Sequence, residues 1–230
     1  MVADGAIVEE EREERELRDS YGAALLLELI SVLVLIAAGG TAALVLTGAA
    51  ALLQVVALMV TLRVSGVAHR LVVMVSFAAG LAYVLGAASH IAGGAVGQDV
   101  AIVLWLALAI ATMGAIVRRL TSYLQVNLQL IMGLLVVYLL IGVGFGLAYR
   151  LAEAFAPGAF APVNQGVSGA TYFSFVTLAT LGYGDITPVT SVARALAVAE
   201  AITGQLYLVS VVSLAISRLG ILRRRTSEKP

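Results

Sequence analysis

The sequence predicts an all-α membrane protein with six transmembrane helices. Of its 230 residues, 61% are hydrophobic and 12% are charged, and the mean hydropathy is +1.02. Soluble domains typically contain about 45–50% apolar residues, so this composition excludes a soluble domain. The chain contains no cysteine, which excludes disulfides and thiolate metal sites.

The hydrophobic residues fall in runs long enough to cross a membrane, for which about 20 residues are needed. We expect helices at Ala23–Ala38, Ala42–Leu62, Leu71–Ala88, Val100–Val117, Val126–Tyr149 and Val192–Leu219. The first two runs are separated by Gly39-Gly40-Thr41 alone, so a single kinked helix is an alternative.

The basic residues decide between these alternatives. With six spans and both termini in the cytoplasm, nearly all Arg and Lys lie on the cytoplasmic side, and only Arg150 and Arg194 lie outside. An odd number of spans in the first half would scatter them, against the positive-inside rule. We therefore expect six spans.

One stretch between the last two predicted spans has a different composition. Thr180-Leu181-Gly182-Tyr183-Gly184-Asp185 follows a short apolar helix predicted at Gly169–Ala179, which Ser168 can cap. Glycine reaches left-handed backbone angles without steric cost, so Gly182 and Gly184 allow consecutive carbonyls to face one axis. An ordinary turn is the alternative, because Gly and Asp are common turn residues.

This stretch resembles the selectivity filter of potassium channels. The match continues through Ile186-Thr187-Pro188-Val189-Thr190 and extends over roughly Leu124 to Leu219. The family also carries a basic residue and an inner-helix hinge glycine, which correspond here to Arg194 and Gly204. The resemblance implies a short re-entrant pore helix between an outer and an inner helix.

The resemblance also implies what the chain binds and where it lies. Backbone carbonyls would replace the hydration shell of K⁺. The expected ion-binding residues are Thr180, Leu181, Gly182, Tyr183 and Gly184, with K⁺ at the first four. The expected partners are three further identical subunits and the plasma-membrane bilayer. A prokaryotic source, no organic cofactor, no nucleic acid and no enzymatic step are also expected.

Combined with composition, the resemblance divides the chain into four parts. These are a charged cytoplasmic segment at 1–22, a four-helix scaffold at 23–122, a pore domain at 123–219 and a basic tail at 220–230. The first segment is rich in Glu and Arg at 9–18, which indicates either a solvated helix or an assembly helix.

The fourth predicted span, Val100–Val117, contains no Arg or Lys. Voltage sensors need several charges inside the membrane, so the predicted channel is not strongly voltage-gated. Five basic residues at the cytoplasmic ends of spans are instead expected to attract anionic lipids. They are Arg118, Arg119, Arg223, Arg224 and Arg225.

Glu200 is an ionisable residue well inside the last span, which makes it a functional candidate. We expect it to contact Ser174 or Thr177 of the short helix, or to share a proton with Asp185. In several potassium channels an acid on the pore helix supports the filter, and Val176 occupies that position here. Desolvation disfavours the charged form of Glu200, and a protonated carboxyl can donate to these groups.

The sequence also predicts the contacts or positions of several other residues. The Tyr172 hydroxyl is expected to reach Asp185. Glu28 is expected to snorkel or to pair with an arginine such as Arg63 or Arg118. Helical spacing places Gln205, Val209, Val212 and Ile216 on one stripe facing a cavity below the filter.

Two other functions fit the sequence less well. A secondary transporter would show inverted repeats around a midplane site, and no second half matches the filter-bearing hairpin. A non-conducting or regulatory channel subunit remains the main alternative, although the intact filter sequence argues against it.

Overall fold

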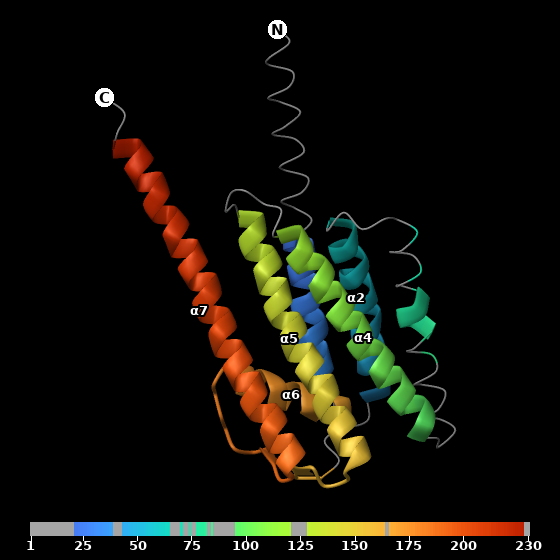
Figure 1. Cartoon of the computed structure of the whole chain (residues 1–230). Helices are drawn as coiled ribbons and strands as arrows, with labels where there is room; N and C mark the ends of the chain where they lie inside the picture. The colour runs from blue at the N-terminus through green and yellow to red at the C-terminus, as the bar shows by residue number, and fades with distance from the viewer. Residues whose placement is uncertain are drawn as a thin grey trace.

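The computed structural model describes residues 21–38, 43–64, 77–81, 95–120, 128–163 and 166–227, and single positions 70, 74 and 84. Side chains are described in these ranges except at 43–44, 95–98, 119–120, 128–129 and 214–227. Nearly all of the described backbone is helical. Figure 1 shows long helices side by side, with the short helix α6 near one end of the bundle.

Among the described residues, three long helices form the N-terminal part of the bundle: Tyr21–Ala37, α2 (Ala43–Val64) and α4 (Ala95–Leu120). The first helix and α2 are antiparallel, since Ser31 bonds Ala50 whereas Glu28 bonds Gln54. The alternative of one kinked helix over both segments is therefore wrong. α4 packs against α2 and α5.

The C-terminal part consists of α5 (Leu128–Phe155), α6 (Gly166–Leu178) and α7 (Ser191–Ser227). α6 packs against both long helices. Two short strands, β1 (Phe160–Ala161) and β2 (Thr187–Pro188), pair antiparallel with Phe160 opposite Pro188. This pairing ties the segment before α6 to the segment before α7.

Four of the described helices are long and apolar enough to cross a membrane. Their apolar windows are Val45–Val64, Asp99–Arg118, Leu130–Phe155 and Ser191–Ser213, and Tyr21–Ala37 is a shorter apolar helix. The predicted span Leu71–Ala88 and the charged segment 1–22 lie mostly outside the described residues. Six spans therefore stays a prediction.

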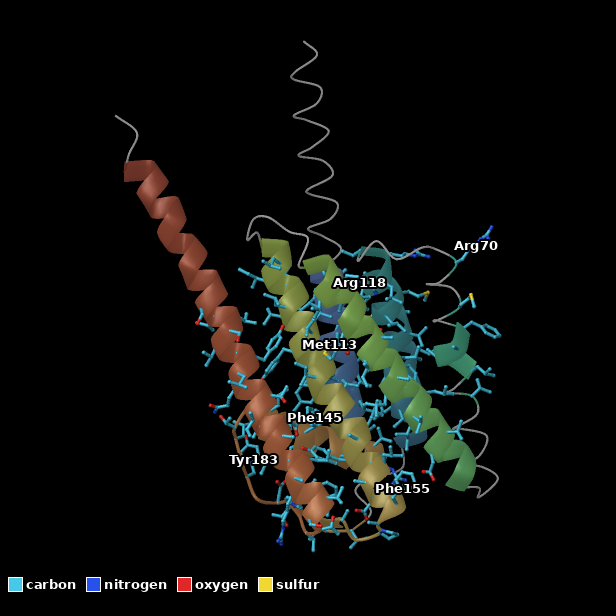
Figure 2. All side chains as sticks on the ribbon, viewed as in Figure 1. Arg70, Met113, Arg118, Phe145, Phe155 and Tyr183 are labelled. Carbon is cyan, nitrogen blue, oxygen red and sulfur yellow. The ribbon has the colours of Figure 1, made fainter. Side chains whose placement is uncertain are left out.

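The surface of these helices is apolar where a soluble protein would be polar. Leu26, Val45, Leu52 and Ile110 are more than half exposed. Such side chains match hydrocarbon rather than water, and together with the apolar windows they indicate a membrane protein. Figure 2 shows Arg70 and Arg118 at the end of the bundle opposite Phe155.

α5 is the central helix of the bundle. Half of its apolar window is buried (50%), compared with 11% of the window in α7. Small residues let α6 approach it closely: a Cβ built on Gly142 would lie 2.6 Å from the Phe175 ring, and one on Gly146 would lie 3.0 Å from the Thr171 Cα.

We predict that Gly146→Ala destabilises the fold, because its new methyl group would meet a backbone atom of α6 that cannot move alone. The expected loss is about 1–3 kcal/mol in the free energy of unfolding, measured by denaturant titration in detergent micelles. Gly144→Ala is the matched control in the same helix, since its nearest neighbour would be Leu106 Cδ1 at 4.0 Å. Equal effects of the two substitutions would contradict close packing at Gly146.

Candidate functional site

The stretch Thr180–Gly184 begins directly at the end of α6. The backbone N–H of Thr180 donates to Thr177 O at 3.0 Å, and that of Leu181 donates to Val176 O at 2.9 Å. These bonds satisfy two of the carbonyls that the end of the helix leaves without a partner inside the helix. The position of the end of α6 therefore fixes the start of the stretch.

Alternate residues of this stretch have left-handed backbone angles. The φ values are 58° at Thr180, 58° at Gly182 and 78° at Gly184. Such angles have no steric cost for glycine, but they are unusual for a β-branched residue such as Thr180. A non-glycine residue held in a strained conformation points to a functional role. The strain at Thr180 was not predicted from the sequence.

The stretch is exposed on the isolated chain. Leu181 is 55% and Tyr183 is 65% exposed, whereas Ile186 just beyond is buried. Figure 2 shows Tyr183 toward the end of the molecule that carries Phe155, away from Arg118. One side of the stretch thus faces α6, and the other is open.

Asp185, which directly follows the stretch, is bonded to a residue of α6. Tyr172 donates a side-chain hydrogen bond to Asp185, and this bond is the main cause that raises the pKa of the Tyr172 phenol. The expectation that the Tyr172 hydroxyl reaches Asp185 is therefore confirmed.

Glu200 lies at the junction of α5, α6 and α7 and is fully buried. Its carboxyl contacts the Ser174 hydroxyl, as predicted, and accepts a hydrogen bond from the Tyr149 hydroxyl. Its two oxygens are thus partnered by Tyr149 and Ser174 and, among the described residues, by neither of the alternatives Thr177 and Asp185; Asp185 accepts from Tyr172 instead. Tyr149 was missed, because a tyrosine near the end of an apolar span is typical of the membrane interface.

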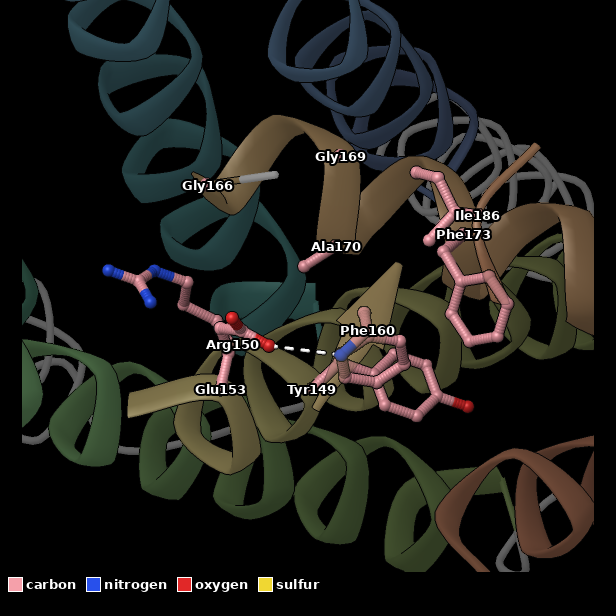
Figure 3. Close-up of a pocket in the computed structure, with 9 residues that line it drawn as sticks. All are labelled: Tyr149, Arg150, Glu153, Phe160, Gly166, Gly169, Ala170, Phe173 and Ile186. Carbon is pink, nitrogen blue, oxygen red and sulfur yellow. Dashed lines mark hydrogen bonds between the residues drawn. The ribbon is translucent and has the colours of Figure 1, made fainter. Parts of the chain in front are cut away.

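A second set of contacts holds the segment between α5 and α6. Both Glu153 oxygens accept backbone N–H bonds, from Gly158 at 2.9 Å and Phe160 at 3.1 Å. Figure 3 shows the Glu153 carboxylate reaching Phe160 at the edge of a cavity of about 20 Å³, while the Tyr149 hydroxyl points away from Glu153. This cavity has no room for an organic ligand. Glu153 therefore fixes β1, and through β1 the strand β2 that follows Asp185.

The residues predicted to form one stripe on α7 are described in part. Gln205, Val209 and Val212 are exposed, whereas the Ile216 side chain lies outside the described side chains. Gly204 is buried, and a Cβ there would lie 2.7 Å from Leu178 Cδ1. Its absent side chain thus allows α7 to approach α6, and α7 is continuous through this position.

Two expectations about polar residues are wrong. Ser168 does not cap α6, because the helix starts earlier, at Gly166 with φ 64°, and the Ser168 hydroxyl donates to Ile36 O at 2.8 Å. Glu28 neither snorkels nor pairs with arginine in the described part of the chain. It is buried and accepts a hydrogen bond from Gln54 Nε2 at 2.6 Å. No signal in the sequence pointed to Gln54 on α2 as its partner.

We predict that Tyr172 ionises above the usual tyrosine pKa of about 10, because it must give up its bond to Asp185. The bond is fully present below that pKa and is lost as the pH rises through the raised value. The difference between alkaline absorbance titrations of the parent and Tyr172→Phe isolates this group. In Asp185→Asn the charge is gone, so Tyr172 should ionise closer to 10; an unchanged titration would contradict the contact.

Part of the chain matches a known protein family. Residues 134–220 match the model of a family described as an ion channel. No curated protein and no solved structure matches the chain. The matched residues run from α5 through α6 and the Thr180–Gly184 stretch into α7, so this part of the chain is similar to an ion channel domain.

Proposed function

We propose that the chain is one subunit of a tetrameric channel that conducts K⁺ passively and selectively across the plasma membrane. The backbone of Thr180–Gly184 carries the proposal. In an ordinary extended chain successive carbonyls point in opposite directions. Left-handed angles at Thr180, Gly182 and Gly184 let them face one side. A row of carbonyls can replace the hydration shell of K⁺.

A single chain supplies one wall of such an ion pathway, so the proposal requires several copies. Two observations support this assembly. The stretch is exposed on the isolated chain, and so is the α7 face formed by Val198, Ile202, Leu206 and Val209. This face continues along α7 toward its C-terminal end, where copies of α7 would surround a cavity. Gln205, Val209, Val212 and Ile216 remain the residues proposed to line it.

The helices before α5 are proposed to act as a scaffold without a voltage sensor. α4 carries Asp99 and, at its other end, Arg118 and Arg119, but no Arg or Lys between Val100 and Val117. Arg118 and Arg119, with Arg223, Arg224 and Arg225, are proposed to attract anionic lipids at the cytoplasmic surface. The side chains of Arg119 and of residues 223–225 lie outside the described side chains.

We predict that the purified chain in lipid bilayers conducts K⁺ in preference to Na⁺. The measurement is the reversal potential under opposing K⁺ and Na⁺ gradients, which should follow the K⁺ gradient. A reversal potential that follows both ions would overturn the selectivity. Failure to conduct at all would favour the alternative of a non-conducting or regulatory subunit.

A matched pair of glycine variants locates the selectivity. Gly182→Ala should abolish selective conduction, because an L-residue in the left-handed region costs about 1–2 kcal/mol and redirects a carbonyl. Gly158→Ala imposes a similar backbone cost at φ 86° outside the stretch. It should lower stability and leave the reversal potential unchanged. Equal loss of selectivity in both variants would argue that the stretch is not the filter.

We further predict that open probability depends only weakly on voltage. Moving one charge across 100 mV supplies about 2.3 kcal/mol, so steep gating needs several mobile charges, and α4 has none within Val100–Val117. The test is a voltage ramp on the parent and on Arg118→Gln, whose curves should both be shallow. A steep curve that Arg118→Gln flattens would show that α4 is a sensor.

A further inference from the structure

The contacts around Glu200 contain more acceptors than available hydrogens if the carboxyl is charged. The Ser174 hydroxyl lies within hydrogen-bonding distance of Glu200 Oε1 and is also 2.6 Å from the carbonyl oxygen of Gly142. A hydroxyl has one hydrogen to donate, and the Gly142 carbonyl has none. The Ser174 hydrogen can therefore serve only one of the two contacts. The other contact needs a hydrogen carried by the neighbouring oxygen.

A proton on the carboxyl supplies that hydrogen. Glu200 then donates to Ser174, Ser174 donates to Gly142 O, and Tyr149 donates to the second Glu200 oxygen. Every polar atom of the group has a partner in this arrangement. With an ionised carboxylate, either the Gly142 contact or the Glu200 contact would bring two oxygens together without a hydrogen, in a site where all three side chains are buried.

We propose that Glu200 is a neutral carboxylic acid that joins α7 to α6 and α5, and that it is a positioning residue for the stretch Thr180–Gly184. Ser174 lies two residues before Val176, whose carbonyl holds Leu181. The group therefore acts on the stretch through α6. This inference rests on the proposed function for its effect on conduction, but not for the protonation state.

Neighbouring contacts support the same junction. The Tyr138 hydroxyl of α5 donates to Leu178 O at 3.2 Å, at the last residue of α6. The Tyr207 hydroxyl of α7 donates to Leu134 O in α5. The first of these bonds joins α5 to α6 and the second joins α7 to α5, whereas the contact of Glu200 with Ser174 joins α7 to α6 directly.

Infrared spectroscopy of the full chain in lipid tests the protonation state without any current. The parent should show a carboxylic acid carbonyl band at neutral pH that Glu200→Gln removes. Tyr149→Phe should shift this band, because one hydrogen bond to the carboxyl is lost. Glu28→Gln, at the buried carboxyl of the first helix, is the matched control and should leave the Tyr149-sensitive band in place. An unchanged band in Glu200→Gln would overturn the proposal.

Conduction tests the positioning role. Gln reproduces one donor and one acceptor, so the K⁺ current of Glu200→Gln should decline under sustained opening at about the parent rate. Glu200→Ala leaves Tyr149 and Ser174 without their partner, and its current should decline roughly tenfold faster. Tyr149→Phe should be intermediate and serves if Glu200→Ala does not fold. A Gln variant as impaired as Ala would overturn the positioning role.

The two sets of measurements separate the proposals. A Tyr149-sensitive acid band without K⁺ current would leave the neutral carboxyl standing and contradict the proposed function. K⁺-selective current without that band would support the function and overturn the neutral carboxyl.

Discussion

The close approach of α5, α6 and α7 is the constraint on which the rest of this structure depends. Without side chains at Gly142, Gly146 and Gly204, α6 lies against both long helices. That approach makes the Gly142 carbonyl reachable by Ser174 and brings Ser174 to Glu200. The end of α6 is then fixed, and the backbone bonds from Thr180 and Leu181 pass this fixed position to the exposed stretch. Packing of small residues is thus a precondition for the polar contacts.

Buried polar groups in the described helices show how a membrane protein keeps them paired. Lipid offers no hydrogen bonds, so an unpaired group is costly. Glu28 is joined to Gln54, and Ser31 contacts both Gln54 and the Ala50 carbonyl. The Glu200 group is arranged similarly, with a carboxyl, a hydroxyl and a backbone carbonyl. In both places the backbone carbonyl that accepts from the serine belongs to a small residue, Ala50 or Gly142.

Sequence reasoning predicted the pairs whose partners are close along the chain or share a helix boundary, such as Tyr172 with Asp185. It also named Ser174 as one of three possible partners of Glu200, with Thr177 and Asp185, because a buried acid needs a donor or acceptor at the same membrane depth. It could not predict Tyr149 or Gln54, since their contacts depend on helix rotation, which an almost uniformly apolar helix does not specify. Helix ends were also underestimated. α5 extends to Phe155 because Arg150 and Glu153 interrupt the apolar run without interrupting the helix.

The conformation of Thr180–Gly184 poses a final physical question. The stretch is bonded to α6 at its start, by Thr180 and Leu181, and tied at its end through Asp185 and β2. Between these points its residues are exposed, and Thr180 is held at a φ that its side chain disfavours. Anchors at both ends can impose such a shape, but within the described part of the chain no backbone N–H donates to the carbonyls of Thr180–Gly184. In the proposed assembly those carbonyls face K⁺ and the same stretch of the other copies. Ion binding would then stabilise the strained backbone, and the rigidity of α6 would decide how well it is held when the ion leaves.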